Sequence, residues 1–367
     1  MKNSLLALAG ALLLASPQVA RADTIRVAVA GPITGPNAAF GVQFHQGVEA
    51  AAAAINKKGG VLGKQIELSY EDDASDPRQG VSIANRIASN GIKFVIGHFN
   101  SGVTIPSSEV YEENGILEIS PSSTAPKYTD RGMWNTFRVC GRDDSLGLVT
   151  ADYVIHHLAD KPIALVDDKT PPGAGQVRAV KEALAKAGIT PVTEQSINLG
   201  EKDFSALITR LKSLHVGTIV FGGVHTEGGL IARQMRDQAL DAKIIGPDGF
   251  ATSEFPAIAG PAADGVLFTF GLDAKKLPSA AAVISDLRSQ KINPDGYLLY
   301  AYAAMQVLAE GMEKANSVDP HKVADALHSG KDYDTVLGPR SFDSKGDIKE
   351  RDFTVYVWRG NEYVEAE

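Results

Sequence analysis

The chain has 367 residues, of which 44% are hydrophobic and 22% are charged, a composition typical of globular proteins. This length exceeds what one compact core usually serves, so it predicts two domains. The formal net charge of −8 excludes a typical nucleic-acid-binding protein, because such proteins need clustered Lys and Arg.

The first residues have the pattern of a secretory signal. Lys2 precedes the apolar run Leu5–Ala15, and Ala20-Arg21-Ala22 puts small residues at the two positions that a signal peptidase recognises. The run is too short to span a bilayer. We therefore expect a signal peptide over residues 1–22 and export to the periplasm of a Gram-negative cell. A buried helix is the alternative, and it is disfavoured because a strand is predicted directly after Asp23.

The mature chain is expected to be free of stable membrane insertion. No Cys stands at the predicted cleavage site to carry a lipid, and no later segment is long and apolar enough to cross a bilayer. Cys140 is the only cysteine, so the exported fold has to rely on its core rather than on an internal disulfide.

After Asp23, predicted strands and helices alternate, which indicates βαβ units in a parallel, doubly wound sheet. Lys57-Lys58-Gly59-Gly60 ends the first helix, and Pro77 begins the second. The predicted strands are Ile25–Ala30, Gln65–Glu71, Phe94–Ile96 and Ile116–Ile119, and the predicted helices are Ala39–Asn56, Pro77–Asn90 and Thr104–Asn114.

A second series of the same kind follows a strand at Thr136–Val139. Its predicted helices are Asp143–Leu158, Gly175–Ala187, Phe204–Leu214 and Glu227–Ala239. Its predicted strands are Ile163–Val166, Val192–Ile197, Thr218–Phe221, Lys243–Ile245 and Val266–Phe270.

The last third of the chain is predicted to be helical at Ala281–Ser289, Tyr297–Lys314 and His321–Ser329 and to end in a strand at Phe353–Trp358. This order is typical of a chain that returns to complete its first domain. We expect two α/β lobes joined by short crossovers that act as a hinge. The first lobe would hold residues 23–141 and 272–351, and the second residues 142–271 and 352–367.

The sequence lacks the motifs of the common enzyme classes that we sought. It has no G-x-S-x-G elbow, no P-loop, no H-E-x-x-H and no paired Cys. Gly173-Ala174-Gly175 resembles the start of a dinucleotide loop, but Arg178 occupies the third glycine position, and a tight turn explains the glycines. The eight His residues are scattered. We expect no cofactor, no metal and no catalysis.

Two strand ends in the first series carry hydroxyl groups. Phe94–Ile96 leads into Gly97-His98-Phe99-Asn100-Ser101, and Ile116–Ile119 leads into Ser120-Pro121-Ser122-Ser123-Thr124. Ligands of open α/β sheets bind outside the carboxyl ends of the strands. Hydroxyls, backbone amides and the start of the helix near Thr104 would suit a carboxylate there.

The second series supplies a complementary acid. Asp248 follows the strand Lys243–Ile245 and could accept hydrogen bonds from an ammonium group, while Phe40, Phe99 and Tyr297 could enclose an apolar group. Each residue alone has a structural explanation, since Ser and Thr cap helices, Asp-Gly forms turns and Phe fills cores. Together they predict a site for a zwitterion between two lobes.

Several stretches with these residues resemble one family. They are IRVAVAGPITGP (25–36), AAINKKGGVLG (53–63), YEDDASDP (70–77), GIKFVIGH (91–98), GILEISPSSTAP (115–126), GEKDFSAL (200–207) and VLGP (336–339). The chain is similar over nearly its whole mature length to periplasmic Leu/Ile/Val-type amino-acid-binding proteins of ABC importers. The resemblance implies a type 1 periplasmic-binding fold with three crossovers, no enzyme activity, and an amino acid and permease subunits as partners.

The resemblance also implies roles for single residues. The family's carboxylate-binding serine falls on Ser101, its small-small-Thr loop on Ser122-Ser123-Thr124, and its acid for the ammonium on Asp248, where better-known members carry Glu. Aromatic walls fall on Phe40 and Tyr297. The candidate ligand-binding residues are Ser101, Ser122, Ser123, Thr124, Asp248, Phe40, Phe99, Asn100, Val224, Tyr297 and Pro172.

The departures from the family pattern concern the ligand's side chain. Pro172 and Val224 align with two cleft tyrosines, and Phe99 stands where branched-chain binders carry Leu. Ser75 and Asn100 replace both Cys of a disulfide that some members have. We therefore expect a small or compact neutral amino acid, in the range of alanine, valine, proline and γ-aminobutyrate, rather than strictly leucine.

Two other functions are compatible with parts of this pattern. The same fold could serve as a ligand-sensing receptor domain for amino acids or short amides, and a neighbouring permease and ATPase gene pair would favour transport. A periplasmic enzyme is disfavoured because no nucleophile–base pair is visible. We expect a monomer.

Overall fold

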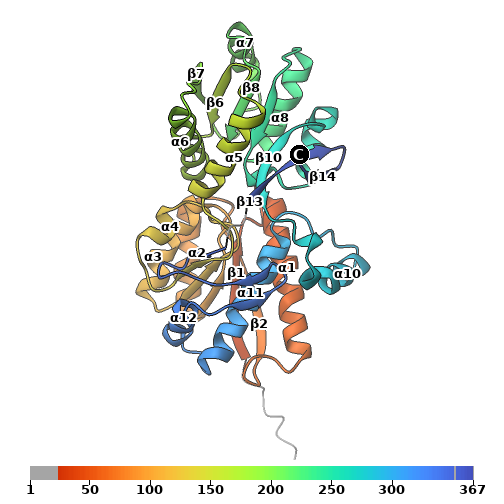
Figure 1. Cartoon of the computed structure of the whole chain (residues 1–367). Helices are drawn as coiled ribbons and strands as arrows, with labels where there is room; N and C mark the ends of the chain where they lie inside the picture. Colours follow the sequence, from red (N-terminus) through yellow and green to blue (C-terminus); the bar gives the residue numbers. More distant parts are fainter. Residues whose placement is uncertain (1–23, 351–352, 367) are drawn as a thin grey trace, which may run out of the picture.

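The structure, a computed structural model, describes residues 24–350 and 353–366 and forms two lobes, each built around its own sheet (Figure 1). The first sheet has five strands in the order β2-β1-β3-β4-β5, and the second has seven in the order β14-β13-β10-β9-β8-β6-β7. The predicted α/β class with two sheet-centred lobes is confirmed. The predicted signal peptide lies outside the described residues.

All strands of the first sheet run parallel. They are β1 (Thr24–Gly31), β2 (Gln65–Asp72), β3 (Phe94–Ile96), β4 (Leu117–Ser120) and β5 (Thr136–Arg138). The helices of this lobe are α1 (Ala38–Lys57), α2 (Pro77–Ser89), α3 (Ser101–Glu113), α4 (Lys127–Asp130), α10 (Ala281–Ser289), α11 (Leu298–Ala315) and α12 (Pro320–His328).

The second half of strand β1, residues 27–31, is continuously apolar because both of its faces are buried. Val27 and Val29 belong to the core cluster that includes residues of α1 and α11, whereas Ala28 and Ala30 face the cluster formed with α2 and α3. A parallel strand covered by helices on both faces has no polar side. The late helix α11 packs against α1, so this part of the chain lies beside the first sheet.

The second sheet combines a parallel part with an antiparallel edge. Its strands are β6 (Ile163–Asp167), β7 (Thr193–Ser196), β8 (Thr218–Gly222), β9 (Lys243–Gly246), β10 (Leu267–Gly271), β13 (Phe353–Arg359) and β14 (Glu362–Glu365). Strand β13 runs antiparallel to β10, and β14 forms a hairpin with β13 that the sequence reading did not include. Its helices are α5 (Asp143–His157), α6 (Pro171–Lys186), α7 (Ser205–Ser213), α8 (His225–Asp237) and α9 (Glu254–Ala259).

Short elements complete the described chain. They are the 3₁₀ helices η1 (Asp248–Phe250), η2 (Gly260–Ala263), η3 (Ala274–Lys276) and η4 (Pro278–Ala280), and the antiparallel strand pair β11 (Tyr333–Thr335) and β12 (Gly338–Arg340). None of the helices in the described ranges combines the length and apolar character that a bilayer span requires.

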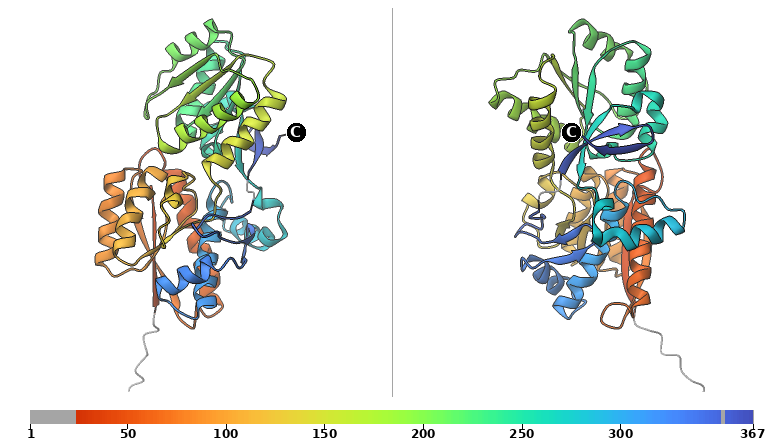
Figure 2. Two further views of the ribbon diagram at one scale, coloured as in Figure 1. Left: turned by 60° about the vertical axis from the view of Figure 1, so that its left-hand side comes forward. Right: turned by 45° about the vertical axis from the view of Figure 1, so that its right-hand side comes forward.

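The chain passes between the lobes after β5, after β10 and before β13 (Figure 2). These passages lie together, because Gly271 pairs with Phe353 and a Cβ on Gly141 would lie 2.2 Å from the Phe353 ring. Only glycine fits position 141 without a shift of that ring. The predicted lobe boundaries stay predictions, and the last, at residues 351–352, lies outside the described residues.

Two helices that border the interlobe region begin earlier than predicted. Helix α3 begins at Ser101, with Asn100 at its N-cap, rather than at Thr104. Helix α6 begins at Pro171 rather than at Gly175, because the Thr170 hydroxyl accepts from the Gly173 amide at 3.2 Å and proline suits the first helical positions. Pro172 therefore stands in the first turn of α6 and not in a loop.

Candidate functional site

A cavity of about 330 Å³ lies between the lobes, near the lower end of the range of about 300–1,000 Å³ for small-molecule sites. It is formed where the carboxyl ends of β3 and β4 in one sheet face those of β6, β8 and β9 in the other. Nine of the predicted site residues line it: Phe99, Asn100, Ser101, Ser122, Thr124, Pro172, Val224, Asp248 and Tyr297.

One end of the cavity carries hydroxyls and the start of a helix. Ser101 is 2% exposed and is the first residue of α3, where backbone amides have no acceptor within the helix. Its hydroxyl oxygen accepts from the Ala125 amide at 3.2 Å, which leaves its proton available for a ligand. Thr124 lines the same end. The positive end of the α3 dipole and these hydroxyls suit a carboxylate.

The loop after β4 is held in place by its own hydroxyls. Ser122 donates to the Phe99 carbonyl at 3.0 Å, and Ser123 donates to the His98 carbonyl at 3.2 Å. The Ser123 amide also donates to the Ser120 hydroxyl at 2.9 Å. Ser123 does not line the cavity, because these bonds turn it toward β3. It ties the two strand-end loops together, behind the lining residues.

Two carboxyl groups of the second lobe, those of Asp248 and Asp143, also line the cavity. Asp248 begins η1 directly after β9, and Tyr297 of the first lobe donates a hydrogen bond to it. Burial raises the Asp248 pKa to about 6, against the lowering effect of the Tyr297 hydroxyl. Asp143, the first residue of α5, is 3% exposed, and its pKa is raised to about 8 by burial and by the nearby Asp248 charge.

Asp143 is a lining residue that the sequence reading missed. An acid at the start of a helix is ordinarily explained by the helix dipole, so its position gave no separate signal. Its amide donates to the Thr124 carbonyl at 2.9 Å across the two lobes, and its Oδ2 atom has no hydrogen-bond partner among residues 24–350 and 353–366. It therefore lies between the hydroxyl end of the cavity and Asp248.

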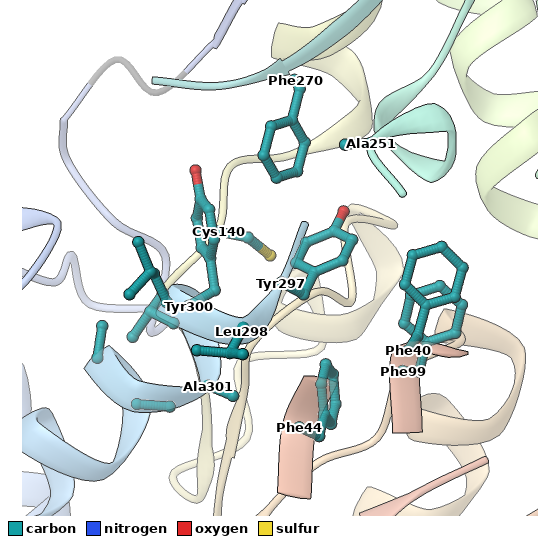
Figure 3. Packing of buried hydrophobic residues seen from close by; sticks show 14 of the residues in the cluster. Phe40, Phe44, Phe99, Cys140, Ala251, Phe270, Tyr297, Leu298, Tyr300 and Ala301 are labelled. Carbon is teal, nitrogen blue, oxygen red and sulfur yellow. The ribbon is translucent and has the colours of Figure 1, made fainter. Parts of the chain in front are cut away.

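Aromatic rings form one wall, as Figure 3 shows. Phe99 lines the cavity and stacks on Phe40 with ring centroids 4.1 Å apart, while Tyr297 lies edge-on to both rings at about 6 Å. Phe40 is fully buried and is not a lining residue. It contacts His225 of the second lobe at 5.2 Å between centroids, so it supports the wall from behind.

The second lobe adds polar lining residues that were not predicted. Asp168, Thr170, Gln176 and Glu227 line the cavity beside Pro172 and Val224. Asp168 accepts from the Thr170 hydroxyl at 2.6 Å and from the Thr170 amide at 2.9 Å. Asp168 directly follows the end of β6, and this strand-end position was the signal that could have identified it, whereas Glu227 lies in the first turn of α8, the helix after β8.

In the described part of the chain, no group of three or more His, Cys, Asp or Glu side chains is arranged to hold a metal ion. Cys140 is buried. The cavity thus offers hydroxyls and a helix start at one end, carboxyl groups opposite, and an aromatic wall between them. This arrangement can bind both charged ends of a small zwitterion.

A family model and individual relatives all match this chain over most of its length. Residues 24–362 match a family model described as periplasmic binding protein. Leu/Ile/Val-binding protein homolog 1 of Brucella melitensis is 48% identical over 91% of this chain and 90% of its own length. Leu/Ile/Val-binding protein BraC3 of Rhizobium johnstonii is 45% identical over 96% of both chains.

Solved structures show the same fold. The leucine binding protein LivK of Thermotoga maritima superposes with a TM-score of 0.86 at 24% identity, covering 94% of this chain and 98% of its own. LivJ of Streptococcus pneumoniae, solved in complex with isoleucine, gives a TM-score of 0.84 at 24% identity, covering 93% and 98%.

Proposed function

The chain belongs to the periplasmic binding protein family, and from this membership we propose that it binds an amino acid in the interlobe cavity and delivers it to the permease of an ABC importer. Its place of action would be the periplasm. The relatives that match almost the whole chain are named as Leu/Ile/Val-binding proteins, which supports a binding role without catalysis.

The observation that carries this proposal is the shared lining of one cavity by Ser101 and Thr124 from one lobe and Asp248 from the other. The amino acid's carboxylate would accept from the two hydroxyls and the first amides of α3, and its ammonium would donate to Asp248. Charge-assisted hydrogen bonds of this kind contribute about 1.5–3 kcal/mol each.

Binding of this kind favours a closed arrangement. A ligand that contacts both lobes stabilises the state in which both sets of residues reach it, and the equilibrium shifts by the difference in its affinity for the open and closed states. The three adjoining passages between the lobes provide the hinge. We propose that the closed state is the form recognised by the permease.

We propose a compact, neutral ligand in the range of alanine, valine, proline and γ-aminobutyrate. Phe99 adds bulk to the wall beside the predicted amino-acid position, and it is held by its stacking on Phe40. Among the described residues that line the cavity, none is Lys, Arg or His. A ligand with a second carboxylate would therefore face Asp168 or Glu227 without a compensating cation.

The test is a thermal-shift screen of the purified protein with amino acids and small carboxylates. A ligand at 100 times its dissociation constant adds about 2.7 kcal/mol to the free energy of unfolding. Small-angle scattering of the same samples should show a smaller radius of gyration with the ligand that stabilises most. The proposal would be contradicted if no amino acid stabilised the protein and none made it more compact.

A further inference from the structure

The second-lobe end of the cavity contains a buried amide that the amino-acid site does not use. Gln176, the sixth residue of α6, is 1% exposed and lines the cavity. Neither its Nε2 nor its Oε1 atom has a hydrogen-bond partner within residues 24–350 and 353–366. A buried amide whose donor and acceptor both lack partners is costly, so a group that satisfies both would be bound preferentially.

Glu227 adds an acceptor to the same lining. It stands in the first turn of α8 and is 3% exposed. Its Oε1 atom accepts from the Gly200 amide at 2.9 Å, whereas its Oε2 atom has no partner in the described part of the chain. The Glu227 charge also helps to raise the pKa of Asp168, behind burial as the main cause, which places the two acids in one neighbourhood.

This end connects to the proposed ammonium position through Asp143. The Asp143 Oδ2 atom lies 3.7 Å from the point that a Cβ on Gly175 would occupy, and Gln176 is the next residue of α6. Asp248, Asp143, Gln176 and Glu227 all line this one cavity.

We propose that Gln176 and Glu227 form a second subsite that binds a carboxamide on the ligand's side chain. The ligand's amide N–H groups would donate to the Gln176 Oε1 and Glu227 Oε2 atoms, and its carbonyl would accept from Gln176 Nε2. This inference rests on the proposed function and makes it more specific. The compact neutral ligand becomes one with a terminal amide, of the asparagine or glutamine type.

Other side chains would leave part of this lining unsatisfied. An aliphatic group satisfies none of the three polar atoms, and a carboxylate would be repelled by Glu227 and Asp168. An ammonium group would pair with Glu227, but the Gln176 Nε2 donors would then face a positive charge. Only a group that both donates and accepts fits all three atoms.

The test is isothermal titration calorimetry with ligands that differ mainly in the side-chain head: asparagine, leucine, aspartate and 2,4-diaminobutyrate, with glutamine, alanine, valine and proline alongside. We expect asparagine or glutamine to bind at least tenfold more tightly than leucine, aspartate or 2,4-diaminobutyrate. The Gln176→Met variant, which keeps the side-chain length and removes the amide, should reduce the asparagine-to-leucine affinity ratio at least fivefold. The exposed Gln290→Met variant serves as the matched control and should leave the ratio unchanged.

The outcomes separate this inference from the function on which it rests. Binding of alanine, valine or proline without a carboxamide preference would overturn the subsite alone, as would tighter binding of 2,4-diaminobutyrate. An unchanged affinity ratio in folded Gln176→Met would also overturn it. Absence of binding by every amino acid would overturn the proposed function and the subsite together. The ligand series measured on the wild-type protein tests the subsite even if Gln176→Met does not fold.

Discussion

The phenol of Tyr297 in the first lobe donates a hydrogen bond to the carboxylate of Asp248 in the second. Tyr297 is itself positioned by its amide, which donates to Gln43 at 2.8 Å. Beside it, Gly296 has a φ of 55°, and a Cβ there would lie 2.6 Å from the Ala251 carbonyl oxygen of the other lobe. The group proposed to receive the ligand's ammonium is thus already linked to the opposite lobe.

Tyr297→Phe should weaken amino-acid binding. The variant removes the donor that stabilises the Asp248 carboxylate, so the pKa of Asp248 should rise further and less of the protein should carry the charge at pH 7. We expect about a tenfold loss of affinity at pH 7, close to the lower end of the range for a hydrogen bond to a charged group. Calorimetry should show a smaller loss at pH 8.5. Tyr70→Phe, at an exposed tyrosine, is the control, and equal affinities for Tyr297→Phe and wild type would contradict the assignment.

Affinity of the wild-type protein should rise with pH between 5 and 8. The pKa of Asp248 is about 6 and that of Asp143 about 8, whereas the ligand's ammonium stays charged throughout this range. An ammonium binds the carboxylate form, so binding below these values requires loss of a proton and weakens as pH falls. Dissociation constants measured at pH 5, 6, 7 and 8 test this. A constant that is flat or rises with pH would argue against ammonium binding at these acids.

Asp143→Asn should stabilise the ligand-free protein, more at high pH than at low pH. The Asp143 pKa is raised by burial, so the native state holds its proton between about pH 4 and 8 while the unfolded state has lost it. Wild-type stability therefore falls as pH rises through this window, and the Asn variant lacks that loss. We expect a Tm gain of about 2–4 °C at pH 8.5, corresponding to about 1 kcal/mol, and less at pH 5.

Asp144→Asn is the matched control for this measurement. The adjacent Asp144 has a lowered pKa, with Arg142 as its hydrogen-bonding and charge partner, so its removal should not stabilise the protein at pH 8.5. A Tm gain for Asp143→Asn that becomes smaller as pH rises would contradict the assignment of a raised pKa to Asp143.

Ser101→Ala combined with Thr124→Ala should abolish amino-acid binding with little loss of thermal stability. Both hydroxyls line the proposed carboxylate position. The loss of the Ser101 hydroxyl leaves the Ala125 amide without its acceptor, which should cost about 1 kcal/mol. Calorimetry and thermal denaturation of the same sample separate the two effects. The exposed Ser213→Ala variant is the control. Amino-acid affinity retained in the double variant would contradict the proposed carboxylate site.

Phe99→Leu should shift preference toward longer aliphatic side chains. The smaller residue enlarges the cavity and removes the stacking on Phe40. A methylene-sized difference in an apolar pocket is worth about 1–3 kcal/mol, so the leucine-to-alanine affinity ratio should rise about tenfold or more. Calorimetry with alanine, valine and leucine measures the ratio. An unchanged ligand profile would show that Phe99 does not limit the space for the ligand.

Much of this fold could be read from the sequence because hydrophobic periodicity and Gly/Pro positions report local structure. Strand β3 and helix α10 were predicted with their exact bounds. The predicted start of α6 at Gly175 was wrong, because the Thr170 hydroxyl caps the helix and Pro171 suits its first position. Strand β14 was missed because a short, largely exposed edge strand lacks an apolar pattern.

The site was harder to predict than the fold, since lining residues are selected by the tertiary arrangement. The strand-end hydroxyls Ser101 and Thr124 and the acid Asp248 carried a chemical signal and lie on one cavity. Gln176 carried none, because a single polar residue in an amphipathic helix is ordinarily exposed. Only the packing of α6 against its neighbours reveals that it is buried. The roles of all these residues stay predictions until binding is measured.

The pairing of Gly271 with Phe353, and the contact of Gly141 with the Phe353 ring, have a mechanical consequence. Strands that are hydrogen-bonded side by side cannot slide along one another without breaking several bonds at once. Because β10 and β13 are paired in this way up to Gly271 and Phe353, we expect the two passages at their ends to move together when the lobes separate. A hinge at this edge would open the cavity on its far side, so ligand entry and exit would share one route.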